Sequence, residues 1–248
     1  MKDQEKNNKT NKKYTDYTKA LAEENILSES DMQYVCNHQE KYTLQDYYAL
    51  PDTQRVELID GMFYDMAAPG LAHRTAAAQI FRQLDAFIDM QDGSCLPFMS
   101  PVDVQLDCDD RTMVQPDVVV LCDMRKARER CIYGAPDLVI EVLSPSTAWK
   151  DQVIKRKKYQ HAGVREYWMI DLKQEKVIVY DFEHEYHPVI YGMDVPVPVR
   201  IYEGKCQIQF DGFYARMKSL LASDASSAAI RVKESQAATY LSAVSVKP

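Results

Sequence analysis

Short apolar runs in the middle of the chain have the length and composition of β-strands. The runs are Phe98–Leu106, Met113–Leu121, Asp137–Leu143, Glu166–Asp171 and Lys176–Phe182. Met113–Leu121 ends in four apolar residues, and Asp137–Leu143 is apolar except at Asp137 and Glu141. Such runs are typical of strands buried on both faces. The last two runs are joined by a turn at Lys173–Glu175, so they are expected to extend the same sheet.

Two segments outside these runs have the apolar spacing of helices. Leu71–Met90 places Ala76, Ile80, Leu84, Phe87 and Ile88 on one apolar face, which predicts an amphipathic helix. A second helix is predicted from Ser146 to about His161, ending at Gly163, because glycine readily adopts the left-handed conformation of a helix stop.

The N-terminal part of the fold carries two local signals. Thr43 and Asp46 have the spacing of a capping box for a short helix that ends before Pro51. In RVELIDGMFYDM, two apolar runs flank Asp60-Gly61, which predicts a β-hairpin.

These elements predict an α/β domain with a mixed central sheet flanked by helices. We expect this domain to span residues 41–222. Residues 1–40 are polar and are expected to form a flexible arm with one short helix near Asp16–Glu24, and residues 223–248 a Ser- and Ala-rich tail.

Composition narrows the class of protein. The chain has 248 residues and no apolar run of about 18 residues, so a membrane partner is not expected. There is no secretory signal, and the six cysteines form no CxxC pair, which predicts a cytoplasmic protein with reduced thiols. A net charge of −7 argues against coating nucleic acid by charge alone, although two basic clusters, at 125–130 and 150–158, could contact it locally.

Candidate chemistry begins with Glu141, a carboxylate in the apolar run PDLVIEVL. A buried carboxylate needs a hydrogen-bonded, ionic or metal partner. Asp137 lies four strand residues away, about 13 Å, too far to share an ion with Glu141. Asp117, in QPDVVVL, converges on Glu141 if the two strands are neighbours, and two carboxylates plus waters suit Mg²⁺ or Mn²⁺.

Phosphodiester hydrolysis at such an ion also needs a positive side chain. In many metal nucleases it is a lysine two residues after the glutamate, but that position is Leu143 here. Lys155 shares one helix face with Asp151 and Tyr159, so it is expected to reach back to the strand end while Lys157 and Lys158 contact backbone phosphates. The alternative is an Asp151–Lys155 ion pair on a solvated helix.

The order ELIDG, His73, QPDVVV, PDLVIEVLSPST, D-x-x-x-K-x-x-x-Y and GVREYWMID resembles the Uma-two family of restriction endonuclease-like proteins, in the PD-(D/E)XK nuclease superfamily. The resemblance covers about Tyr42–Phe213. It implies that Asp117 and Glu141 are the metal-binding carboxylates and that Lys155 is the displaced lysine. The Leu143 departure weakens the strict motif.

Two more residues are candidates for the site. Glu57 lies beside the Asp-Gly turn, where the superfamily often has a further acidic residue, and the alternative is a half-exposed strand glutamate. His73 begins the long helix, where it could contact phosphate or polarise water, and the alternative is a packing residue.

The sequence therefore predicts a magnesium-dependent endonuclease that hydrolyses phosphodiester bonds in DNA. A non-catalytic nucleic-acid-binding or regulatory module with the same fold is the main alternative. A glycosidase that uses Asp117 and Glu141 as its acid and base ranks lower, because the two lie in aliphatic strands beside lysines. Homodimer formation and the cleavage sequence stay open.

Overall fold

The computed structural model describes residues 42–51, 53–144, 148–184, 187–216 and 218–219. The predicted helix near Asp16–Glu24, the rest of the N-terminal arm and the C-terminal tail lie outside these residues. The described residues divide into two compact units. The first contains the residues up to Met66 together with Val104–Val114, and the second contains Ala67–Asp103 and the residues from Gln115 onward.

In the first unit, a short helix and a hairpin form as the sequence predicts. Helix α3 (Leu44–Ala49) begins after Thr43, whose side chain and Asp46 form a complete capping box. Strands β1 (Val56–Ile59) and β2 (Met62–Asp65) pair antiparallel. Positive φ angles at Asp60 and Gly61, 49° and 76°, match a two-residue hairpin turn. Strand β4 (Val104–Gln105) completes the strands of this unit.

The second unit is built on a six-stranded mixed sheet with the order β10-β9-β8-β7-β5-β3. The strands are β3 (Leu96–Met99), β5 (Val118–Leu121), β7 (Leu138–Val142), β8 (Glu166–Asp171), β9 (Lys176–Asp181) and β10 (Val189–Gly192). All neighbours pair antiparallel except β7 and β8, which are parallel. A parallel pair needs a long crossover, and the helical segments η2 (Lys150–Lys155) and α5 (Arg156–Ala162) supply it. Gly163 ends α5 with φ 92°, as predicted.

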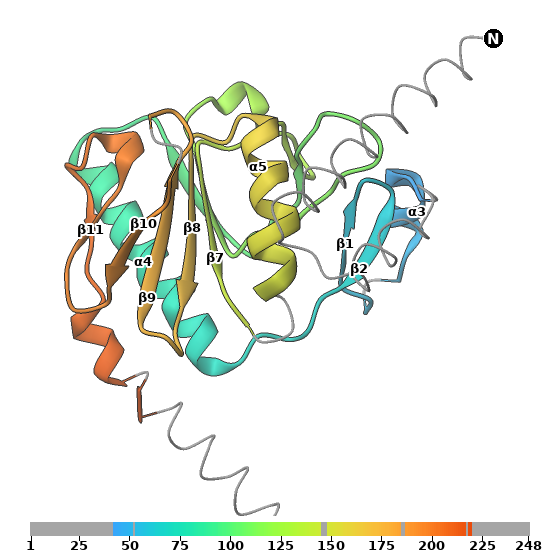
Figure 1. Ribbon diagram of the computed structural model, residues 1–248. Helices are drawn as coiled ribbons and strands as arrows, with labels where there is room; N and C mark the ends of the chain where they lie inside the picture. The colour runs from blue at the N-terminus through green and yellow to red at the C-terminus, as the bar shows by residue number, and fades with distance from the viewer. Residues whose placement is uncertain (1–41, 52, 145–147, 185–186, 217, 220–248) are drawn as a thin grey trace, which may run out of the picture. The chain divides into compact units, whose positions relative to one another are not determined.

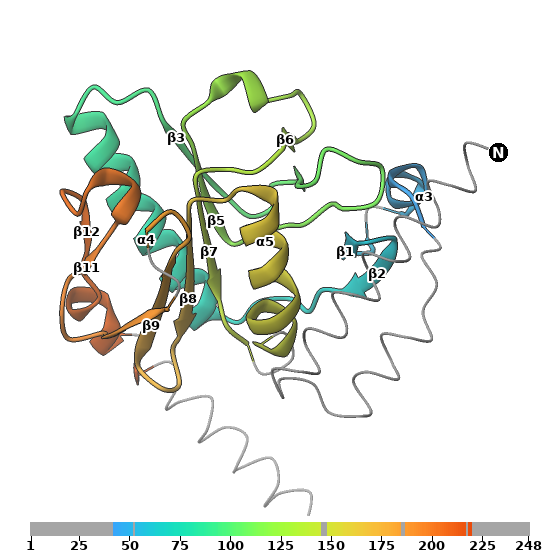
Figure 2. The ribbon, with the colours of Figure 1, turned by 45° about the horizontal axis from the view of Figure 1, so that its top comes forward.

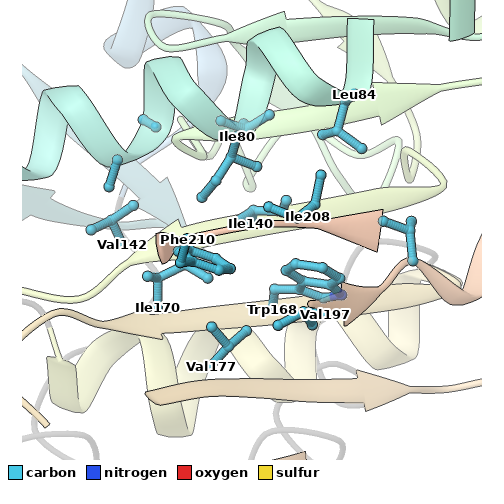
Figure 3. Close-up of a cluster of buried hydrophobic side chains, with 14 of the residues drawn as sticks. Ile80, Leu84, Ile140, Val142, Trp168, Ile170, Val177, Val197, Ile208 and Phe210 are labelled. Atoms are coloured by element: carbon cyan, nitrogen blue, oxygen red, sulfur yellow. The ribbon is translucent and has the colours of Figure 1, made fainter. Parts of the chain in front are cut away.

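Helices cover both faces of this sheet (Figures 1 and 2). Helix α4 (Leu71–Met90) buries Ala76, Ile80, Leu84 and Ile88, which lie on its predicted apolar face. Figure 3 shows Ile80 and Leu84 above the side chains that β7 and β8 direct to the same face. On the opposite face, the rings of Tyr159 in α5 and Tyr167 in β8 lie 5.0 Å apart.

Smaller elements complete the second unit. They are η1 (Met124–Lys126), β6 (Ile132–Tyr133), β11 (Val197–Pro198), η3 (Arg200–Tyr202) and β12 (Gln207–Ile208). The fully buried Glu166 of β8 accepts hydrogen bonds from Trp168 Nε1 (2.6 Å) and the Ile201 amide (2.9 Å), which ties η3 to the sheet. Burial raises the pKa of the Glu166 carboxyl. No described helix combines the length and apolarity needed to cross a membrane.

Two predicted strands are shorter than the sequence suggested. The run Phe98–Leu106 is divided into β3 and β4, and only the end of Met113–Leu121 forms β5. Pro101 and Pro116 explain both interruptions, because proline cannot donate a hydrogen bond to a strand ladder. Met113 and Val114 instead bridge to Leu58 and Val104 in the first unit.

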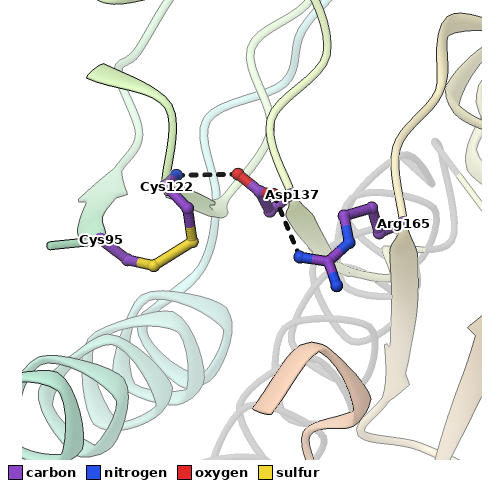
Figure 4. Close-up of a disulfide and its surroundings, with 4 residues drawn as sticks. All are labelled: Cys95, Cys122, Asp137 and Arg165. Atoms are coloured by element: carbon purple, nitrogen blue, oxygen red, sulfur yellow. Dashed lines mark hydrogen bonds and ion pairs between the residues drawn. A yellow bond between two sulfur atoms is a disulfide. The ribbon is translucent and has the colours of Figure 1, made fainter. Parts of the chain in front are cut away.

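The expectation of reduced thiols throughout is wrong for one pair of cysteines. Cys95 and Cys122 form a disulfide that joins the residues just beyond the Leu96–Leu121 pair of β3 and β5 (Figure 4). The two cysteines are 27 residues apart, so spacing gave no signal, and the antiparallel register alone sets them opposite each other. Beside them, Asp137 Oδ2 accepts the Cys122 amide at 2.7 Å and Oδ1 lies 3.3 Å from Arg165.

Candidate active site

The Asp117 carboxylate lies at the end of the β5–β7 pair. Asp117 directly precedes β5, and extending the register of Val118 with Ile140 by one residue sets it opposite Glu141. The Val142 amide points to this side of β7 beyond the last paired residue of β5, and Asp117 Oδ2 accepts its hydrogen bond at 2.8 Å. The side chain therefore takes the place of a strand carbonyl and is held in one orientation.

His73 is the third residue of α4 and reaches the same carboxylate. Its Nε2 lies 3.2 Å from Asp117 Oδ2, and both side chains are mostly shielded, with exposed fractions of 16% and 17%. This pairing is also what a satisfied packing histidine would show, so a catalytic role of His73 stays a prediction. His73 is positioned to orient Asp117.

Glu141 has the partners that its burial demands. The residue is 4% exposed, and its Oε1 lies 2.5 Å from Lys155 Nζ. The same oxygen accepts a hydrogen bond from the Tyr159 hydroxyl at 2.8 Å. A buried carboxylate with a cation and a hydroxyl on one oxygen is compensated for much of its lost hydration.

The lysine comes from a π-helical segment rather than from a regular α-helix. Residues Lys150–Lys155 form η2, in which Asp151 and Lys155 are paired at 3.3 Å. Tyr167 fixes this segment by donating a hydrogen bond to the Asp151 carbonyl at 3.1 Å. Single π-helical turns are frequent at functional sites because the wider turn changes which side chains face inward.

Carboxylates and an ammonium group lie close together in this cluster. Glu141 and Asp151 contribute two carboxylates and Lys155 contributes one ammonium group, all with side chains at most 6% exposed. Asp117 adds a third carboxylate beside the backbone of Val142. Carboxylate oxygens are the donors that Mg²⁺ and Mn²⁺ prefer.

The structure confirms one prediction about the lysines and contradicts two others. Lys155 was expected within about 6 Å of a site carboxylate, and its 2.5 Å contact with Glu141 confirms this. The solvated Asp151–Lys155 pair is wrong, because the pair exists but is buried. The surface role of Lys157 is also wrong, because this residue is only 8% exposed.

Glu57 is buried rather than half exposed. It lies in β1 of the first unit, opposite Tyr64 in the hairpin, and its relative exposure is 0%. The catalytic role of Glu57 stays a prediction.

A bridging metal between Asp117 and Glu141 also stays a prediction. Among the described residues, no three His, Cys, Asp or Glu side chains gather into a metal-binding group. Two carboxylates with waters remain compatible with Mg²⁺, which usually keeps several water ligands.

Two residues that contact the site were not among the predicted catalytic residues. Tyr159 bonds Glu141 directly, and Asp151 bonds the lysine that contacts Glu141. The signal for both was the i, i+4, i+8 spacing around Lys155, which places the three side chains on one helix face.

Comparisons with known proteins show the family and the fold of the chain. Residues 44–207 match the model of the Uma2 family, described as "Putative restriction endonuclease". A crystal structure of "a putative nuclease belonging to DUF820" from Anabaena variabilis is 21% identical, with a TM-score of 0.58. That likeness covers 71% of this chain and 98% of the other, and it shows a shared fold.

A relative in Synechocystis sp., "Uncharacterized protein slr1290", is 29% identical over 123 residues. The match covers 49% of this chain and 63% of the relative, so the chain spans less than two thirds of that protein's length. The family assignment therefore rests on the family model.

Proposed function

Because the chain belongs to the Uma2 family of restriction endonuclease-like proteins, we propose that it is a Mg²⁺- or Mn²⁺-dependent endonuclease that hydrolyses phosphodiester bonds in DNA. The family match and the restriction-endonuclease-like α/β fold support a nuclease-like function with nucleic acid as the substrate class. The metal dependence, the choice of DNA and the roles of individual residues are the content of the proposal.

The observation that carries the proposal is the buried contact between Lys155 and Glu141. The strand position two residues after Glu141 holds Leu143, which has no charge. Lys155 supplies an ammonium group at Glu141 Oε1 from the crossover helix instead, at 2.5 Å. In this proposal, Lys155 serves as the cation that a nuclease needs beside its strand carboxylate.

The residues present fit a magnesium or manganese ion. Asp117 and Glu141 provide hard oxygen donors, and carboxylates with waters are the set that these ions prefer. We assign Asp117 and Glu141 as the residues that would hold the ion. When bound, such an ion lowers the pKa of a coordinated water and neutralises charge on phosphate oxygens.

The chain's own side chains have separable roles in this site. The Lys155 ammonium stabilises negative charge on the phosphate and opposes the repulsion between close carboxylates. Tyr159 holds the Glu141 carboxylate through a 2.8 Å hydrogen bond. His73 holds Asp117, and orienting partners of metal-binding carboxylates affect activity through the geometry they impose.

A digestion assay on plasmid and on single-stranded DNA tests the proposal. Wild-type protein is expected to nick or linearise plasmid with Mg²⁺ or Mn²⁺ and to be inactive in EDTA, whereas Glu141→Gln is inactive in both. Glu166→Gln is the matched control, because it changes another buried strand glutamate outside this cluster and should leave cleavage per folded molecule intact. Equal cleavage by wild type and Glu141→Gln would refute the site.

A binding module without catalysis is the second candidate, and one observation favours it. Lys155 already compensates Glu141, so the fold does not require an ion at that carboxylate. Calorimetric titration with Mg²⁺ separates the two functions. Heat of binding that disappears in Glu141→Gln supports the nuclease, and no heat together with retained DNA affinity supports the binding module.

A further inference from the structure

Trp149 is an exposed aromatic side chain next to the candidate active site. It directly precedes η2, two residues before Asp151, and is 36% exposed. No described residue accepts a hydrogen bond from its indole N–H. The other tryptophan of the chain, Trp168, is fully buried and donates to Glu166 at 2.6 Å. Core packing therefore accounts for Trp168 but leaves much of the Trp149 ring in contact with solvent.

The helical segment that follows has a distinct solvent side. Asp151 and Lys155 are buried toward Glu141, whereas Trp149 and Gln152 are exposed and Arg156 is half buried. The Arg156 guanidinium lies 5.5 Å from the ring centroid of Tyr180, and its Nε donates to the Gln152 carbonyl at 3.3 Å. The accessible side chains of this segment thus include an indole and a cation held against Tyr180.

We infer that Trp149 is a stacking platform for an unpaired nucleobase, with Arg156 contacting a phosphate of the same strand. The inference rests on the proposed function, because it assigns the nucleic acid of the same site. Sites for single-stranded nucleic acid combine aromatic rings, on which bases stack, with cations that follow the backbone.

Distances along the helix fit this assignment. Trp149 lies six residues before Lys155 and seven before Arg156, and since a π-helical turn is shorter than an α-helical one, the separations along the axis are at most about 9 Å and 10 Å. A strand in duplex geometry rises about 3.4 Å per nucleotide and an unpaired strand can be more extended, so these spans correspond to at most about three nucleotides. A phosphate held at Lys155 therefore leaves a base two or three positions away within reach of the indole.

Tryptophan fluorescence gives a test that does not depend on cleavage. The full-length protein is titrated in EDTA and low salt with a fluorescently labelled 12-nucleotide single strand and with the matching duplex, and anisotropy of the label measures affinity separately. The inference predicts saturable quenching that is stronger with the single strand and is absent in Trp149→Phe, where only the buried Trp168 reports. Bound single strand without quenching, equal quenching by duplex, or no binding would each overturn it.

Affinity of the variants gives the second measurement. Trp149→Ala is expected to weaken single-strand binding about tenfold, and Trp149→Phe to retain most of it, since stacking on phenylalanine is still available. Tyr133→Ala removes a comparably exposed ring, 37%, from β6 and should leave affinity unchanged. Equal affinity of wild type and Trp149→Ala would overturn the inference.

The failure of this inference is distinguishable from failure of the nuclease proposal. Quenching without cleavage in Mg²⁺ keeps the stacking platform and removes the catalytic assignment. Cleavage without quenching keeps the nuclease and removes the role of Trp149.

Discussion

At each end of the β5–β7 strand pair, an aspartate side chain accepts a backbone amide of the neighbouring strand. The surroundings of the two aspartates differ. At one end, Asp117 accepts the Val142 amide at 2.8 Å, and at the other, Asp137 accepts the Cys122 amide at 2.7 Å. Each aspartate follows a proline and immediately precedes its strand. Each side chain thus completes a ladder that the neighbouring strand is too short to complete, so a Pro-Asp dipeptide has a sufficient structural explanation without catalysis.

The surroundings of the two aspartates differ in what they bury. Asp137 pairs with Arg165, which also binds Glu183 at 2.9 Å and is 38% exposed, and a disulfide closes that end. Asp117 pairs with His73, next to the strand that carries Glu141 and its buried lysine. The end stabilised by partly exposed ion pairs and a covalent bond is structural, whereas the end that lies beside a buried carboxylate–lysine contact is the candidate for catalysis.

Replacing the cation at each end of the strand pair should have a large effect on turnover at one end and none at the other. Lys155→Met should lower turnover by about 10² to 10³ at saturating DNA, because it removes the charge that stabilises the anionic transition state. Arg165→Met removes a cation of the other end and should leave turnover per folded molecule unchanged. Rates are normalised to the folded fraction from circular dichroism, and equal turnover of wild type and Lys155→Met would return Lys155 to a structural role.

Removal of the disulfide should lower stability without lowering turnover, the opposite of what is expected for Lys155→Met. Closing the loop from Cys95 to Cys122, 27 residues apart, contributes about 3.5 kcal/mol to the free energy of unfolding by restricting the unfolded chain. Cys95→Ser with Cys122→Ser should lower the midpoint of urea unfolding and leave turnover of the folded protein intact. A variant with unchanged stability but impaired turnover would contradict the structural assignment of this end.

The smallest effect concerns Glu166 and pH. Burial raises the pKa of this carboxyl in the folded protein, so the folded state binds the proton more tightly than the unfolded chain does. The stabilising contribution of the bound proton is complete below the pKa of the unfolded chain, about 4.3, and is lost as pH rises through the higher pKa of the folded protein. Thermal melts across this range should show a smaller pH dependence in Glu166→Gln, and identical slopes would contradict the prediction.

Sequence reasoning predicted elements whose signals are local. The Thr43–Asp46 capping box, the Asp60-Gly61 hairpin and the Leu71–Met90 helix each depend on residues close in the chain, and each is confirmed. The contact of Lys155 with Glu141 was also predictable, because strand and helix are consecutive and the i, i+4 spacing fixes the helix face.

Features that depend on tertiary context were not predictable in the same way. The partner of Cys95 is set by the register of β3 with β5. Lys157 is only 8% exposed, and burial of a side chain depends on packing that the residue pattern of one helix does not reveal. The full burial of Glu57 depends on how the hairpin packs. Sequence reasoning separated Asp117 from Asp137 through the position of Asp137 on the same strand as Glu141, but the amide that each aspartate accepts became evident only from the structure.

A plasmid digestion with Mg²⁺ that compares Asp117→Asn with Asp137→Asn separates the two ends of the sheet most directly. Both changes keep a side-chain oxygen that can accept the neighbouring amide, and both remove one negative charge. We expect Asp117→Asn to abolish cleavage and Asp137→Asn to cleave at the wild-type rate per folded molecule. Wild-type cleavage by Asp117→Asn, or equal loss in both variants, would contradict the assignment of catalysis to the Asp117 end of the sheet.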